Sequence, residues 1–216
     1  MEKQPRRILI ADDHESLRES VRTFLHARPE WQIVAEAADG STALELARTT
    51  QPDIAIIDFA LPLLNGVNLT HALRCELPHI EILLYTIHER DNILLNVLRA
   101  GARAYVLKSD AARHLIAAID ALAVHKPYFS STISEMLLFL VLECGGHESA
   151  SVSLTPGERQ VVQLIAEGKI NTEIARVLGV SIKSVEAQRI VAMHKLNLTT
   201  TAALVRYAVH NGLVLR

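Results

Sequence analysis

Residues 8–15 read ILIADDHE: four apolar residues are followed by two aspartates, a histidine and a glutamate. A short apolar run without alternating polar residues is typical of a strand that is buried on both faces, as in a parallel sheet. Similar runs, each with a polar residue directly behind it, are IIDF at 56–59, LLYT at 83–86 and YVLK at 105–108. The pattern predicts buried strands whose carboxyl ends carry polar side chains.

This pattern extends over the first half of the chain as an alternation of strands and helices. Five strands are predicted, at Ile8–Ala11, Ile33–Ala37, Ile54–Ile57, Ile82–Tyr85 and Ala104–Leu107. Amphipathic spacing predicts helices near 15–27, 41–49, 66–76, 91–100 and 111–124. Such an alternation forms an open, doubly wound α/β sheet that binds ligands at the carboxyl ends of its strands. We therefore expect residues 6–123 to form a domain around a five-stranded parallel sheet.

After Pro127 the pattern changes to a linker. A helix over 131–143, capped by Ser130 or Ser131, contains the block MLLFLVL at 136–142. Because this block is apolar all round, we expect the helix to be packed; the first domain, the second domain and another copy of the chain are alternative partners. The polar stretch GGHESAS at 145–151 is typical of a flexible tether. We assign 124–149 to the linker and 150–215 to a second domain.

The second domain is expected to be all-helical, with four short helices. Thr155, Pro156 and Glu158 form the signature of a capping box with proline at the first helical position. Three further helices are expected, from a cap at Asn171 to Gly179, from a cap at Ser181 to about Leu196, and from a cap at Thr199 or Thr200 to near Asn211 and Gly212. The second and third of the four helices, joined by a short turn, form a helix-turn-helix unit.

The net charge of −2 is the sum of an acidic part and a basic part. Residues 1–149 contain 14 Lys+Arg and 20 Asp+Glu, which gives −6, whereas residues 150–216 contain 8 and 4, which gives +4. Cys75 and Cys144 lack the spacing of a metal site or a disulfide scaffold, which indicates a reducing compartment. The longest apolar run, Met136–Leu142, is too short to cross a bilayer. We expect a cytoplasmic protein without a membrane partner.

Polar residues at four strand ends predict a phosphate-transfer site. Asp12 and Asp13 follow the first strand and Asp58 follows the third, while Thr86 and Lys108 end the fourth and fifth. Three carboxylates in one crevice need a cation, and oxygen ligands suit Mg²⁺. Asp58 would then be the phosphoacceptor, with Lys108 and Thr86 binding phosphate oxygens. For Asp13, a helix cap is the alternative role.

The segments ILIADDHE, IIDFALPLLNG, LLYTIHER and AGARAYVLKSD resemble the flavodoxin-like receiver domain of bacterial two-component response regulators. The resemblance implies that Asp58 takes a phosphoryl group from a sensor histidine kinase. It also implies that Asp13, Asp58 and the Ala60 carbonyl bind Mg²⁺ with help from Asp12. On phosphorylation Thr86 would move toward the phosphate and Tyr105 would turn inward.

The third helix of the second domain, SIKSVEAQRIVAMHKL at 181–196, is the candidate for entry into a DNA groove. Helical spacing predicts a core-facing side with Val185, Gln188, Ala192 and Leu196. The opposite, base-reading side carries Lys183, Glu186, Ala187, Ile190 and His194. Phosphate contacts are expected from Lys183, Ser184, Arg189 and Lys195, and from Asn171 and Thr172 of the preceding helix. Ile190 is either a contact to a thymine methyl or ordinary exposed apolar area.

Residues 154–198, LTPGERQVVQLIAEGKINTEIARVLGVSIKSVEAQRIVAMHKLNL, resemble the LuxR-type DNA-binding domain. Together with the receiver, this resembles the NarL/FixJ class of response regulators. The resemblance implies a transcription regulator rather than an enzyme, which binds double-stranded promoter DNA as a homodimer when active. The last helix presents Leu204, Val205 and Ala208 as one apolar stripe, and part of this stripe must serve the domain's own core. The resemblance implies that this helix also pairs the protomers.

Two alternatives to phosphorylation-controlled DNA binding stay open. The receiver can serve as a dimerisation module that works without phosphorylation. The same fold also supports a metal-dependent phosphohydrolase or a nucleotide-binding protein. The segment ADDHE lacks the glycines that let a backbone approach a pyrophosphate, which is evidence against nucleotide binding.

Overall fold

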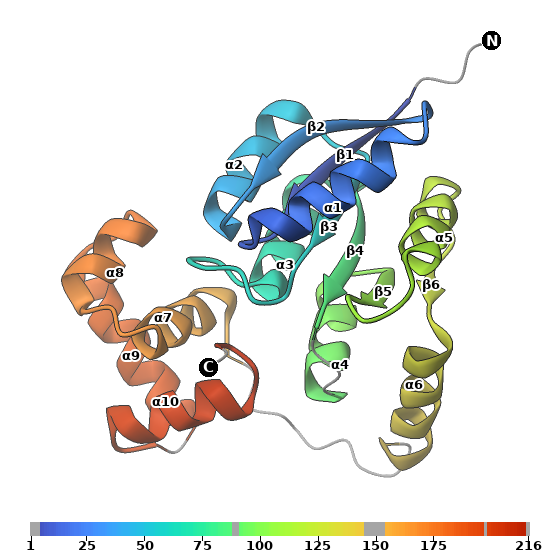
Figure 1. Ribbon diagram of the computed structural model, residues 1–216. Helices are drawn as coiled ribbons and strands as arrows, with labels where there is room; N and C mark the ends of the chain where they lie inside the picture. Colours follow the sequence, from blue (N-terminus) through green and yellow to red (C-terminus); the bar gives the residue numbers. More distant parts are fainter. Residues whose placement is uncertain (1–4, 88–90, 145–153, 197, 215–216) are drawn as a thin grey trace. The chain divides into compact units, whose positions relative to one another are not determined.

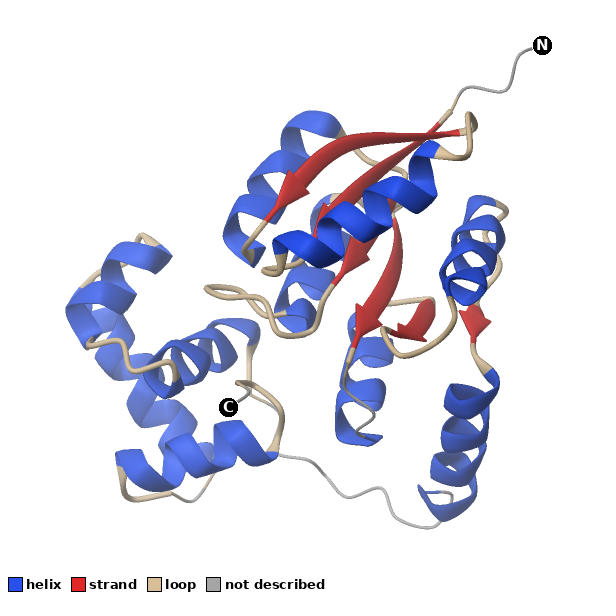
Figure 2. Cartoon of the chain, in the orientation of Figure 1, coloured by secondary structure: helices blue, strands red, loops and turns tan. Residues whose placement is uncertain are grey.

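The computed structural model describes residues 5–87, 91–144, 154–196 and 198–214. The chain divides into two compact units, Met1–Glu143 and Cys144–Arg216. The first is built from strands and helices and the second from helices (Figure 2). Among the described residues, no helix combines the length and the apolar composition needed to cross a membrane.

The first unit contains a parallel sheet with the strand order β2-β1-β3-β4-β5-β6 (Figure 1). Its strands within the described residues are β1 (Arg6–Ala11), β2 (Trp31–Ala37), β3 (Ile54–Ile57), β4 (Glu81–Thr86), β5 (Ala104–Leu107) and β6 (Tyr128–Phe129). Every residue of β3, β4 and β5 is buried, as strands covered on both faces require. The parallel α/β fold is thereby confirmed.

The sixth strand corrects the expected number of five. Tyr128 pairs with Ala104, and Phe129 pairs with Tyr105. Two half-buried residues at the edge of a sheet are too few to produce a periodic pattern, which is why the sequence did not indicate this strand.

Helices cover both faces of the sheet. They are α1 (Glu15–His26), α2 (Gly40–Thr50), α3 (Gly66–Glu76), α4 (Asp91–Ala100) and α5 (Ala112–Ala123). Buried residues of α1 and α5, such as Val21 and Ile119, form one core cluster with Ile10, Ile56 and Val106 of the strands. α2, α3 and α4 lie side by side along the other face (Figure 1). The sheet is therefore doubly wound, as expected.

The linker helix α6 (Ser131–Cys144) follows β6. Ile133 is buried, but Leu138 and Phe139 are 61% and 55% exposed. The first unit therefore does not cover these two side chains, and their packing on the second unit or on another copy of the chain stays a prediction. Met136 and Leu137 of the apolar block are half-buried, and its last residues, 140–142, lie outside the residues whose side chains are described.

The second unit contains α7 (Pro156–Ala166), α8 (Asn171–Leu178), α9 (Ile182–Lys195) and α10 (Thr201–His210). The capping box at α7 is confirmed: the Glu158 amide donates to Thr155 Oγ1 at 3.3 Å, and the Thr155 amide donates to Glu158 Oε2 at 2.9 Å. Ser181 caps α9, and Gly179 ends α8 in a left-handed conformation with φ 64°. The helix-turn-helix unit predicted from the sequence is present.

The predicted cap of α8 is wrong by one residue. Asn171 is the first helical residue, and Ile170 is the N-cap. The isoleucine side chain cannot accept a hydrogen bond. The Ile170 backbone amide, however, donates to Glu173 Oε2 at 2.9 Å, so a carboxylate from the first turn of α8 satisfies the N-cap amide.

The two threonines before α10 provide a test of this local structure. Thr200 Oγ1 accepts a hydrogen bond from the Ala203 amide at 3.2 Å, whereas the neighbouring Thr199 is exposed and precedes the cap. We expect Thr200→Ala to destabilise α10 by about 1 kcal/mol because it removes the cap. Amide hydrogen exchange in α10 measures this directly. Thr199→Ala is the matched control, and equal effects of the two substitutions would contradict the assignment.

Candidate functional site

Side chains from four strand ends meet in one buried pocket of the first unit. Lys108 Nζ lies 2.6 Å from Asp12 Oδ2 and 3.1 Å from Asp58 Oδ2. The three side chains are only 3–6% exposed. Thr86, at the end of β4, is also fully buried and donates a side-chain hydrogen bond to Asp58. The sequence-predicted residues are thus together, because adjacent parallel strands end on the same edge of the sheet.

The surroundings of Asp58 disfavour the charged form of its carboxyl group. Burial raises its pKa, and the negative charge of Asp12 adds to this, whereas Lys108 and the hydrogen bond from Thr86 lower it; the net pKa is raised. The Phe59 amide donates to Asp58 Oδ1 at 2.7 Å and fixes the orientation of the carboxylate. A nearby cation stabilises the charged form of such a buried carboxylate. The second oxygen of Asp58, Oδ2, faces the Lys108 ammonium.

Asp13 and His14 lie at the edge of the pocket. His14, not Asp13, is the N-cap of α1, so the structure excludes the alternative role of Asp13 as that cap. His14 Nδ1 lies 2.7 Å from Asp13 Oδ1. Ligand atoms of Asp12, Asp13, His14 and Asp58 all lie within 4.8 Å of one another. This donor set fits a divalent cation, and the sequence interpretation had omitted His14 although it follows the two aspartates directly.

The loop after β3 brings α3 against the backbone of the phosphoacceptor candidate. A Cβ atom at Gly66 would lie 2.5 Å from the Asp58 carbonyl oxygen and 2.9 Å from Phe59 Cα. The Gly66 amide donates to the Phe59 carbonyl at 2.9 Å, which closes the loop. Glycine at 66 is therefore required for this close approach. Ala60 lies half-buried in the same loop, and metal binding by its carbonyl stays a prediction.

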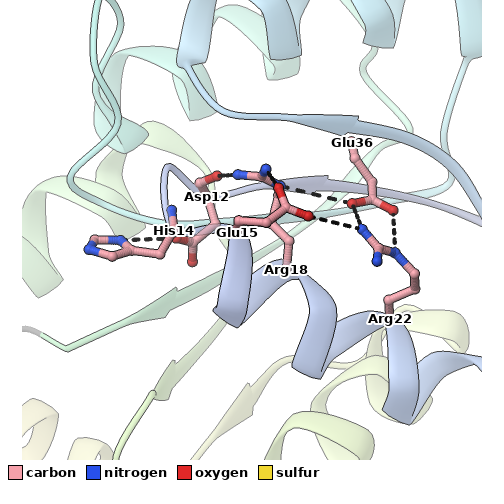
Figure 3. A network of polar contacts seen from close by, with 6 residues as sticks. All are labelled: Asp12, His14, Glu15, Arg18, Arg22 and Glu36. Atoms are coloured by element: carbon pink, nitrogen blue, oxygen red, sulfur yellow. Dashed lines mark hydrogen bonds and ion pairs between the residues drawn. The ribbon is translucent and has the colours of Figure 1, made fainter.

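Arg18 of α1 holds the turn that carries Asp12, and Arg22, one helical turn further on, shares the acidic partners of Arg18 (Figure 3). Arg18 donates to the backbone carbonyl of Asp12 at 2.5 Å and pairs with Glu15. Arg22 holds Glu36 of β2 with two hydrogen bonds, at 2.9 and 2.7 Å, and lies 3.6 Å from Glu15. The guanidinium of Arg18 is thus kept in place by neighbouring charges, and it restrains the backbone next to the carboxylates. The sequence interpretation did not identify these residues.

The two switch candidates are buried. Thr86 is 0% and Tyr105 is 1% exposed, so Tyr105 lies in the inward position that the resemblance associates with phosphorylation. The movements of these residues stay predictions.

In the second unit, α9 has the two sides that its sequence predicted. Val185 and Ala192 are fully buried, and Gln188 and Leu196 are half-buried. The proposed base-reading residues are all exposed, namely Lys183, Glu186, Ala187, Ile190 and His194. Their roles at DNA stay predictions.

Some of the residues expected to contact DNA phosphates already bond other side chains of the second unit. Arg189 bonds the Thr201 hydroxyl, and Lys195 Nζ lies 2.8 and 2.9 Å from the carboxylate oxygens of Glu158. Lys195 therefore joins α9 to α7, and a phosphate contact would compete with this pair. Ser184 is half-buried, with its amide bonded to the capping Ser181. Asn171 and Thr172 line an open hollow together with Lys169, Glu186 and Arg189.

The predicted pairing residues of the last helix need correction. Leu204 and Ala208 are fully buried in the core of the second unit. They have no surface to offer to another protomer, because the stripe that was assigned to pairing is the one that packs on α7. Val205 is half-buried, and Ala202 and Arg206 are exposed on the same helix. Any pairing through α10 must use this second face.

A parallel α/β unit with aspartates at its strand ends, followed by a helix-turn-helix unit, defines the class of DNA-binding response regulators. Comparison with known proteins identifies a response regulator receiver domain over residues 8–120. A second match, to bacterial regulatory proteins of the luxR family, covers 152–208. The chain belongs to the response regulators of this two-domain type, and its function is the regulation of transcription through DNA binding.

Individual relatives match nearly the whole chain. Transcriptional regulatory protein MctR of Rhizobium johnstonii is 31% identical, over 99% of this chain and 98% of its own. Transcriptional regulatory protein LiaR of Bacillus subtilis is 32% identical, over 96% and 99%. Among solved structures, RcsB of Salmonella enterica bound to the promoter rprA with phosphomimetic BeF3⁻ is 30% identical, with a TM-score of 0.63 over 94% of this chain and 98% of its own.

The raised pKa of Asp58 leads to a prediction about stability. A carboxyl group whose pKa is higher in the folded chain than in the unfolded chain reduces stability as the pH rises through the folded value. Without divalent cations, Asp58→Asn should therefore be more stable than the wild type at neutral pH, and the difference should shrink as the pH falls through the folded pKa. Urea unfolding followed by Trp31, the only tryptophan, measures this in the first unit.

The control for this comparison is Asp13→Asn, because the Asp13 side chain is 34% exposed and its charge is solvated. A neutral-pH stability of Asp58→Asn below that of the wild type would contradict the assigned electrostatics.

The contact between Arg18 and Asp12 leads to a second prediction. Arg18→Ala frees the Asp12 carbonyl, and we expect Mg²⁺ affinity to fall about 10-fold, as is usual when groups that orient metal ligands are removed. Amide chemical shifts during a Mg²⁺ titration measure the affinity. Arg28→Ala removes an arginine that pairs with Glu30 and should leave it unchanged. Equal affinities for wild type and Arg18→Ala would show that the turn is held by other contacts.

Proposed function

We propose that Asp58 accepts a phosphoryl group from a sensor histidine kinase and that phosphorylation controls promoter binding by the second unit. The observation that carries the proposal is the buried pairing of the Asp58 carboxylate with Lys108, 3.1 Å apart, inside a cluster of oxygen ligands. Buried clusters of like charge with one perturbed pKa are characteristic of functional sites.

In the proposed transfer, an Asp58 carboxylate oxygen attacks the phosphorus atom of the phosphohistidine. The new bond joins phosphorus to oxygen, the bond to the histidine nitrogen breaks, and the imidazole leaves with the electron pair. Asp12, Asp13, Asp58 and the Ala60 carbonyl would hold Mg²⁺, which when bound neutralises charge on the phosphoryl oxygens. Lys108 and Thr86, which both contact the Asp58 carboxylate, would bind the product oxygens.

On this proposal the chain is a phosphoryl acceptor and not an enzyme acting on a separate substrate. Residues 6–123 form the receiver, 124–149 the linker and 150–215 the DNA-binding domain. The active form is a homodimer on double-stranded promoter DNA, and access to the promoter places the protein in the cytoplasm. Pairing through α10 would use Val205 and the exposed face around it.

One observation favours a second candidate, a receiver that works without phosphorylation. Tyr105 lies in the inward position, and Thr86 is bonded to the Asp58 carboxylate itself. A receiver preset in this way would hold the second unit in its DNA-binding state permanently.

Promoter binding by the full chain, with and without an acyl-phosphate donor and Mg²⁺, distinguishes the two candidates. We expect the donor to raise the affinity of the wild type by about 5- to 150-fold, the usual range of coupling between sites. Asp58→Asn should not respond, whereas Asp120→Asn, a half-exposed aspartate of α5, should respond like the wild type. High affinity that the donor does not change would favour the preset receiver and reject phosphorylation as the switch.

A further inference from the structure

The recognition helix α9 is apolar on two opposite sides. Its core side is closed by Val185 and Ala192, but Ile190 is 67% and Val191 43% exposed on the other. Ala187, also exposed, lies three and four residues before them, so the three side chains are neighbours on the helix surface. We call these three residues the apolar patch. Single exposed apolar residues are common, but three adjacent ones on a helix that is expected to contact DNA indicate a binding surface.

Polar groups adjoin the apolar patch along α9. Lys183 lies one turn before Ala187, and His194 lies one turn after Ile190; both are exposed. Exposed Glu186 is the third polar neighbour. A surface with an ammonium group and an imidazole at its ends suits a strip of base edges between phosphates better than it suits an apolar protein face.

Base edges in the major groove offer one apolar group, the C5-methyl of thymine. We propose that Ile190 determines sequence preference by packing against a thymine methyl in each half-site. The inference rests on the proposed function, in which α9 enters the major groove. It deepens that function by naming the base that the patch selects.

The test starts from a binding-site selection with the full chain and random duplex DNA. Each thymine of the selected half-site is then replaced singly by deoxyuridine, which removes only the methyl group. At one position we expect the affinity of the wild type to fall about 4-fold, the value that corresponds to one buried CH₂-sized group. With Ile190→Ala this loss should disappear at that position while losses elsewhere persist.

Val177→Ala, an exposed apolar residue of α8 outside the apolar patch, is the control and should keep the wild-type response to deoxyuridine. The far-ultraviolet circular dichroism of Ile190→Ala should match that of the wild type because the side chain is mostly in water. A selected site without any uracil-sensitive position, or an equal loss in wild type and Ile190→Ala, would overturn the inference while leaving DNA binding intact. Failure to select any sequence would instead reject the proposed function itself.

Discussion

The first unit depends on the burial of three charges at its strand ends. Asp12, Asp58 and Lys108 are nearly excluded from water, and the two negative charges are tolerable side by side because the Lys108 ammonium lies between them. Removing the Lys108 ammonium would leave two buried carboxylates without their cationic partner, and breaking a buried ion pair in this way costs about 3–5 kcal/mol. Lys108 stays between two carboxylates only while β1, β3 and β5 end together.

This constraint explains features that lie around the pocket. Gly66 lets α3 begin against the Asp58 backbone, and Arg18 holds the carbonyl of Asp12 from the side of α1. Neither residue touches a phosphoryl group in the proposed mechanism, yet Gly66 fixes the backbone of the proposed phosphoacceptor and Arg18 fixes that of a proposed metal ligand. In the second unit, Glu158 has a comparable position: burial would raise its pKa, but hydrogen bonds from Lys195 and Thr155 outweigh this and hold the pKa low. One carboxylate thus caps α7 and joins it to α9.

The sequence predicted those features of the fold and the site that neighbouring residues in the chain mark. Apolar runs ending in Asp12, Asp58 and Lys108 predicted the sheet and the pocket, because parallel strands place their ends together whatever their separation in the chain. The capping box at Thr155 was equally local. The pairs Arg18–Asp12 and Lys195–Glu158, in contrast, depend on side-chain reach across a turn or between helices, which periodicity does not encode. The stripe of Leu204 and Ala208 was recognised, but a stripe does not state whether it faces its own core or a partner.

On the proposed function, the phosphoryl group is carried by Asp58 and not by its acidic neighbours Asp12 and Asp13. The most direct measurement is to treat the acyl-phosphate-labelled full chain with borohydride, which reduces an aspartyl phosphate to homoserine, and to locate the change by peptide mass spectrometry. We expect homoserine at position 58 alone, and only when Mg²⁺ was present during labelling. Homoserine at position 12 or 13, or labelling that is independent of Mg²⁺, would contradict it.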